Sequence, residues 1–259
     1  MPSKWSNTGA KRAREARAEL GFTREGPLPD VLAVTERGGA HVVLLDLPEG
    51  LAGAYIAKPG CPLLFVNGNQ AIARQRFTLA HEFGHFRMRH RSVVDRQVAI
   101  SGHLHDPDEV CANAFAAEFL MPRDAVGAWA RGNVRGAVTL EHVVLLACDY
   151  GVSAQAARYA LEAAGALTDP QRKDQLDDEI ANELHVALFS RLGLEPIEDE
   201  LAAASAHRPR IPRGLRDSAL GDLLAGHIDV DGFARRLDCE PSRAAAMLGA
   251  FGLDELLPA

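Results

Sequence analysis

The pentapeptide HEFGH, at residues 81–85, constrains this 259-residue chain more than any other part of its sequence. On an α-helix, His81 and His85 face the same way and lie about 6 Å apart along the axis, so both imidazoles can bind one metal ion. Apolar side chains within residues 71–89 are spread widely round such a helix, which predicts that most of it is buried. Because unpaired imidazoles are costly to bury, the motif predicts a metal site rather than a chance group of polar residues.

The residues around the two histidines supply the other groups that a catalytic zinc site needs. Glu82 follows the first histidine by one position, from which its carboxylate can reach a metal-bound water and act as general base. A third protein ligand is required, and two glutamates on the next predicted helix qualify, Glu109 and Glu118. Glu109 is favoured because Asn113, one turn later, can hydrogen-bond to a metal ligand.

Further polar residues near the motif compete for a role in the site. His103 and His105 form an alternative ligand pair, but their polar loop predicts solvated side chains, and the same interpretation applies to His90. For Arg74 and Arg76, solvated helix arginines are as good an interpretation as contact with a substrate.

Turn residues and hydrophobic periodicity predict the elements that flank the motif. The run Asp108–Leu120 is expected to be a second apolar helix, ended by Met121-Pro122, and the polar segment between the two helices is expected to be irregular. From Thr139 onward the chain is expected to be helical. The N-terminal part is predicted to contain a short surface helix at Gly9–Leu20, a helix at Asp30–Arg37 capped by Asp30, and about three strands at His41–Leu47, Gly53–Ala57 and Pro62–Asn67.

Composition narrows the class of protein. No run of about 18 apolar residues occurs, and the basic N-terminus lacks the apolar stretch of a secretory signal, so a cytoplasmic protein without a membrane span is expected. The four cysteines form no C-x-x-C pair and are interpreted as reduced thiols. The net charge of -7 is uneven: residues 1–137 carry 17 basic and 14 acidic side chains, and residues 138–259 carry 11 and 21.

Two later segments share a hydrophobic pattern typical of a helix-turn-helix. Leu146–Leu167 and Phe233–Leu253 align at a constant offset of 87, although Ala-rich helices match one another easily. Gly151 is expected at the turn of the first segment. Residues 139–167 hold one arginine against three acidic side chains, which is unfavourable for contacts to DNA phosphates.

With these motifs, the chain resembles the ImmA/IrrE family of zinc metallopeptidases. The resemblance rests on RQRFTLAHEFGH (residues 74–85) and EVCANAFAAEFLMP (residues 109–122), with GAYIAKPGCPLLFVN (residues 53–67) upstream and LACDYGVSAQAARYALEAAGAL (residues 146–167) downstream. It covers about residues 9 to 167. After Leu167 the chain does not match the sensor domain of the radiation-response members.

The resemblance implies both the site and the substrate. It implies zinc bound by His81, His85 and Glu109, with Glu82 acting in catalysis, and the matches at Asn113 and Met121-Pro122 favour Glu109 over Glu118. It also implies that the substrate is a helix-turn-helix repressor, whose cleavage releases genes for prophage excision, stress or DNA-damage responses.

We therefore expect an α+β fold with a zincin-like metallopeptidase domain at residues 1–137, a helix-turn-helix-like segment at 138–167 and a helical region of unknown role at 168–259. The strand Gly53–Ala57 is a candidate for pairing its edge with an extended substrate segment. The alternative is a DNA-binding or partner-binding regulator that retains a metal site. DNA binding is possible through residues 146–167 or the basic cluster at 207–216, but the charge balance does not favour it.

Overall fold

The structure is a computed structural model that describes residues 3–22, 26–45, 47, 50–57, 62–96, 106–194, 197, 201, 219, 222–223, 225–237 and 239–250. The chain divides into two compact units, Met1–Pro209 and Arg210–Ala259. Residues 138–209 thus share a unit with the HEFGH motif and with Glu109. The domain boundaries expected at residues 137 and 167 stay predictions. The mixed α+β class is confirmed. None of the helices in the described residues is both long and apolar enough to cross a membrane.

The first unit contains a four-stranded sheet with the order β1-β3-β2-β4. β1 (His41–Leu45) is parallel to β3 (Leu63–Asn67), and β2 (Leu51–Ile56) is antiparallel to both β3 and β4 (Val93–Arg96). The three predicted strands are confirmed to within a few residues. β4 lies in the segment that was expected to be irregular, so that expectation is wrong there. The β4 sequence, two valines followed by Asp95 and Arg96, shows no clear alternation of apolar and polar residues. Its pairing with β2 is therefore what makes this segment a strand.

This order also corrects the expected substrate edge. Because β2 pairs with β3 on one side and β4 on the other, its edge cannot accept another strand. Among the described strands, the outer positions are taken by β1 and β4.

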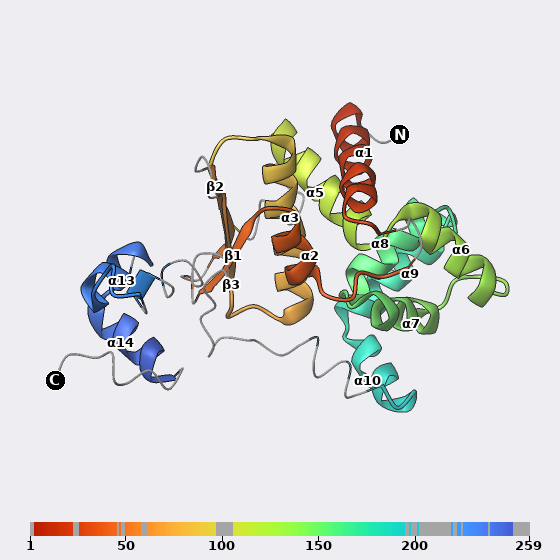
Figure 1. Ribbon diagram of the computed structural model, residues 1–259. Helices are drawn as coiled ribbons and strands as arrows, with labels where there is room; N and C mark the ends of the chain where they lie inside the picture. The colour runs from red at the N-terminus through yellow and green to blue at the C-terminus, as the bar shows by residue number, and fades with distance from the viewer. Residues whose placement is uncertain are drawn as a thin grey trace. The chain divides into compact units, whose positions relative to one another are not determined.

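Helix α3 (Ile72–Met88) carries the HEFGH motif and packs along one face of the sheet, with α5 (Pro107–Leu120) on its other side (Figure 1). The helix is buried over most of its length, as predicted. The two helices approach closely at Gly84, where a Cβ atom would lie 3.1 Å from the Phe115 side chain. A cluster of aromatic rings from both helices fills the space between them: Phe83 lies 5.9 Å from Phe115 and 5.4 Å from Phe119, centroid to centroid.

The helix predicted at Gly9–Leu20 is present as α1 (Lys4–Glu19), which begins earlier and packs one face against α5 while its other face stays exposed. Ala13 and Ala16 are fully buried. A Cβ atom at Gly9 would lie 2.1 Å from the Cys111 carbonyl oxygen, so only glycine allows the two backbones to meet there. The guanidinium of Arg17 is buried and donates to the carbonyl oxygens of Phe119 and Gly26 at 2.7 and 2.9 Å. Small side chains and the two hydrogen bonds of Arg17 thus hold one face of α1 against the core.

The other described helices of this unit are one that precedes the sheet and those that follow α5 in sequence. The Asp30 cap of α2 (Val31–Arg37) is confirmed, because its Oδ1 accepts from the Ala33 amide at 3.0 Å. The later helices are α6 (Arg123–Asn133), α7 (Leu140–Tyr150), α8 (Ala154–Ala163), α9 (Pro170–Ala181) and α10 (Leu184–Arg191). Gly151 occupies the turn between α7 and α8 with a φ of 62°, as predicted.

The second unit contains α13 (Val230–Arg236) and α14 (Pro241–Ala250), packed around Phe233. α14 begins 87 positions after α8, which agrees with the offset of the proposed repeat. The repeat itself stays a prediction, because α7 has 11 residues and α13 has 7.

Candidate metal centre

The two motif histidines lie side by side on the buried face of α3. His81 is fully buried and His85 is 1% exposed. On α5, the side chain of Asp106 caps the helix by accepting from the Asp108 amide at 2.8 Å. This cap starts the helix so that Glu109, in its first turn, faces the two imidazoles.

The donor atoms of these three residues form a compact triangle. His81 Nε2 lies 3.1 Å from His85 Nε2 and 3.3 Å from Glu109 Oε2, and His85 Nε2 lies 3.5 Å from Glu109 Oε1. Donor atoms that surround one zinc tetrahedrally at 2.0–2.1 Å would lie about 3.3 Å apart. His81, His85 and Glu109 therefore form a group that could hold a metal ion, although the two distances to Glu109 end on different oxygens of its carboxylate.

A hydrogen bond to Nδ1 of His81 determines the direction of the lone pair on its other ring nitrogen. The Asn113 oxygen Oδ1 lies 3.0 Å from His81 Nδ1 and can only accept, so the proton is on Nδ1 and the lone pair of Nε2 faces Glu109. The predicted contact of Asn113 with a candidate ligand is thus present. Two imidazole nitrogens and a carboxylate thus converge in a buried space, an arrangement that a cation at their centre would stabilise.

Glu82 follows His81 in the chain and is fully buried, but it is not part of the metal group. Its carboxylate lies between α3 and strand β2, where a Cβ atom at Gly53 would come within 2.6 Å of Glu82 Oε1. Thr78 Cγ2 and the Phe65 carbonyl oxygen also border this position. The glycine of β2 therefore leaves the room that the Glu82 carboxylate occupies.

The structure separates the two glutamates that the sequence left as alternatives. Glu118 turns toward α1, where its Oε1 accepts from Arg14 Nη1 at 3.1 Å, and its Oε2 accepts from the Arg123 amide at 3.4 Å. Only Glu109 joins the histidines. His103 and His105 lie outside the described residues.

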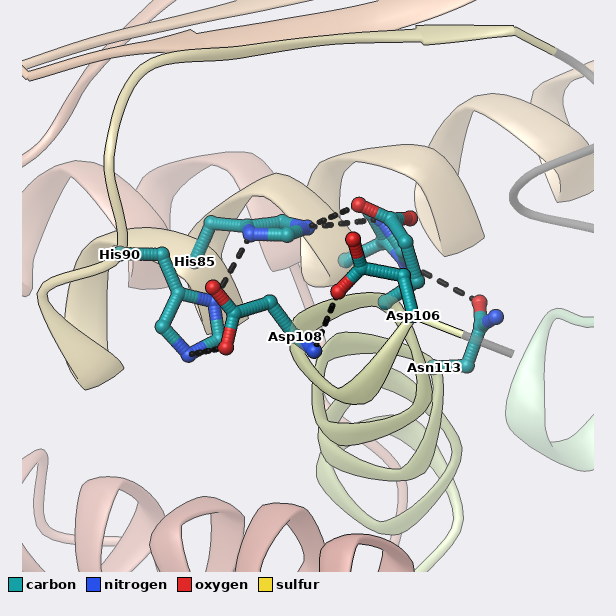
Figure 2. A network of polar contacts seen from close by, with 7 residues as sticks. His85, His90, Asp106, Asp108 and Asn113 are labelled. Atoms are coloured by element: carbon teal, nitrogen blue, oxygen red, sulfur yellow. Dashed lines mark hydrogen bonds and ion pairs between the residues drawn. The ribbon is translucent and has the colours of Figure 1, made fainter. Parts of the chain in front are cut away.

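His90 is not the solvated residue that was expected. Its Nδ1 lies 2.9 Å from His85 Nδ1, and its Nε2 lies 3.4 Å from Asp108 Oδ1 (Figure 2). Burial lowers the pKa of His90, while Asp108 and Glu109 act in the opposite direction. Helical spacing could not reveal this contact, because α3 ends at Met88 and the chain then turns back.

The two arginines that precede the motif are also partly buried. Arg76 Nη2 donates to the Tyr150 carbonyl oxygen at 3.2 Å and to that of Leu28 at 3.5 Å, so the interpretation as a solvated side chain is wrong for it. Burial lowers the pKa of Arg74. Arg76 therefore joins α3 to the end of α7 rather than extending into solvent.

Comparison with known proteins agrees with this architecture. Residues 35–162 match the family model Peptidase_M78, described as an IrrE N-terminal-like domain. A search of curated proteins finds no match. The matched region contains the sheet, both motif helices and the three residues of the metal group. Residues 35–162 are therefore an IrrE N-terminal-like domain, which agrees with the resemblance to the ImmA/IrrE family of peptidases.

Proposed function

We propose that this protein is a zinc-dependent endopeptidase that cleaves a helix-turn-helix repressor. The observation that carries the proposal is the buried convergence of His81, His85 and Glu109, whose nitrogen and oxygen atoms lie 3.1–3.5 Å apart, with Glu82 on the helix that carries both histidines. Membership in a peptidase family supports hydrolysis of a peptide bond.

Each residue of the site has a distinct task in this reaction. His81, His85 and Glu109 would hold zinc, which when bound supplies a Lewis acid that polarises a carbonyl and acidifies water. Glu82 accepts a proton from the attacking water as the new C–O bond forms. It then passes that proton to the nitrogen of the leaving amine as the C–N bond breaks. Asn113 keeps the His81 lone pair directed at the metal position.

An extended substrate segment would pair with β4 rather than β2. β4 is the outer strand on that side of the sheet, and its residue Asp95 pairs with Gly53, which lies against Glu82. Backbone pairing holds a peptide largely independently of its side chains, so the repressor would be cut in an extended segment.

The alternative of a DNA-binding regulator has less support from the contacts of α8. This helix buries Ala157 and Leu161 in the main core. Its single arginine, Arg158, pairs with Glu162 at 2.5 Å and with Asp177 at 2.6 Å. The basic side chain that could contact a phosphate is thus committed within the protein.

The test is incubation of the purified full-length protein with a helix-turn-helix repressor encoded beside its gene, with and without added zinc. Fragments are read by mass spectrometry, and the zinc content of each sample is measured. We expect zinc-dependent cleavage by the wild type and none by Glu82→Gln at the same zinc content. Cleavage that persists in Glu82→Gln would remove the proposed base. Salt-dependent binding to a DNA duplex at about 50 mM salt, without cleavage, would favour the regulator.

A further inference from the structure

The polar contacts of the metal centre extend past the three residues of the metal group to the end of α3. His90 lies between His85 and Asp108, and the three side chains form a continuous chain of contacts (Figure 2). His85 is reached through its Nδ1, the ring nitrogen opposite the one that faces Glu109.

We propose that His90 and Asp108 are positioning residues that fix the ring orientation and tautomer of His85 for metal binding. The proposal rests on the metal site of the proposed function and adds two residues to it. For His85 Nε2 to offer its lone pair to a metal, the ring proton must be on Nδ1. That N–H then donates to His90 Nδ1, which leaves the His90 Nε2 proton facing Asp108 Oδ1.

The backbone holds His90 in this place independently of its side chain. Arg89 ends α3 in the left-handed region, with a φ of 58°. A residue with a side chain rarely adopts this conformation, because its Cβ atom comes too close to the following carbonyl oxygen. The turn directs the His90 amide back to the His85 carbonyl oxygen, 3.0 Å away. His90 is thus attached to His85 by one backbone and one side-chain contact.

The first turn of α5 acts on both ring nitrogens of His85, one directly and the other through His90. Glu109 faces Nε2 directly, and the preceding residue, Asp108, reaches Nδ1 through His90. Asn113, one turn later, does the same for His81. The N-terminal half of α5 therefore orients both histidines. The N-cap residue Asp106 determines where this helix begins. Partners of this kind commonly change metal affinity by about 10–100-fold when they are removed.

The experiment measures zinc affinity of the full-length metal-free protein by competition with a chromophoric chelator. The visible spectrum of the cobalt-substituted protein is recorded beside it. We expect His90→Phe to weaken zinc binding by about 10–100-fold and to alter the cobalt spectrum, because it keeps a ring but removes the acceptor. His90→Asn, whose amide oxygen can occupy the position of Nδ1, should retain most of the affinity.

A double-mutant cycle tests whether Asp108 acts on His85 through His90 or through a separate effect on α5. Asp108→Asn should weaken zinc binding in the wild-type background and have no effect beside His90→Phe. His227→Phe is the control, because it makes the same chemical change at a side chain that is 71% exposed. If His90→Phe does not fold, the comparison of Asp108→Asn in the wild type and in His90→Asn decides instead, since the shorter amide cannot reach Asp108.

The outcomes distinguish this proposal from the proposed function. Unchanged affinity and cobalt spectrum in His90→Phe would overturn the positioning role, and so would equal effects of Asp108→Asn in every background. A wild type that binds neither zinc nor cobalt would instead contradict the metal site on which the proposed function rests.

Discussion

Gly53 of β2 lies directly against the carboxylate of Glu82: a Cβ atom on the glycine would come within 2.6 Å of Glu82 Oε1. The same atom would be 2.7 Å from the Phe65 carbonyl oxygen, which belongs to the neighbouring strand and cannot turn away. The strand is therefore as close to the motif helix as a backbone without a side chain permits. The position of the proposed base depends on that closeness.

Replacing Gly53 with alanine should lower peptidase activity while leaving the metal group intact. The methyl group must move β2 and the Glu82 carboxylate relative to each other, because it also meets the Phe65 carbonyl oxygen. A shift of about 1 Å in a reacting group can reduce the rate by about 100-fold. Zinc content and kcat are measured together. Gly132→Ala is the matched control, because a Cβ atom there meets nothing within 4 Å. Full activity in Gly53→Ala would contradict the prediction that catalysis depends on this position of the Glu82 carboxylate.

Zinc should stabilise the folded protein by an amount that depends on Glu109. A ligand that binds only the native state at 100 times its Kd adds about 2.7 kcal/mol to the free energy of unfolding. Urea denaturation with zinc and with a chelator measures this increment. We expect it to be lost in Glu109→Ala and kept in Glu118→Gln, since Glu118 contacts Arg14 rather than the histidines. An equal increment in both variants would contradict the assignment of the third ligand.

Gly9→Ala should destabilise the protein through the contact of α1 with α5. The added Cβ atom would lie 2.1 Å from the Cys111 carbonyl oxygen, so the helices must separate. Overpacking of this kind costs about 1–3 kcal/mol, whereas alanine in an exposed helix is normally favourable over glycine. Urea midpoints for Gly9→Ala and Gly132→Ala give the comparison. The prediction fails if both substitutions stabilise the protein.

The thiol of Cys148 should react slowly near neutral pH. Burial, followed by the charge of Asp149, raises its pKa to about 11, so at pH 8 only about one molecule in a thousand carries the reactive thiolate. A variant whose other three cysteines are serine is treated with a thiol reagent between pH 7 and 11. The native rate should rise through this range and stay well below the rate in denaturant at pH 8. Equal rates in the native and unfolded protein at pH 8 would contradict the shift.

Several contacts were predictable from the sequence because they are local. The spacing of His81 and His85 places them on one face of any helix, and residue type and spacing were enough to favour Glu109 and Asn113. Apolar residues round the helix indicated its burial. The Asp30 cap and the Gly151 turn were also predictable, since each depends on hydrogen bonds or dihedral angles within a few residues.

Other features could not be predicted because they depend on segments that meet only in the folded chain. β4 is a strand because it pairs with β2, about 40 residues earlier, and this pairing removes β2 from the sheet edge. The contact of α1 with α5 was not predicted because alanines and a glycine carry little hydrophobic signal, yet these small residues are what allow the two helices to meet closely.

By itself, the sequence determined the chemistry of the metal group: two histidines at helical spacing, a neighbouring carboxylate, and a glutamate and an asparagine on the next helix. Only the tertiary structure decided how that group is surrounded. It brings Gly53 against Glu82, directs Glu118 to Arg14, and turns His90 back onto His85. Ligand spacing is set by the geometry of one helix, whereas these contacts are set by how strands and helices pack and by where α3 ends, which no local periodicity encodes.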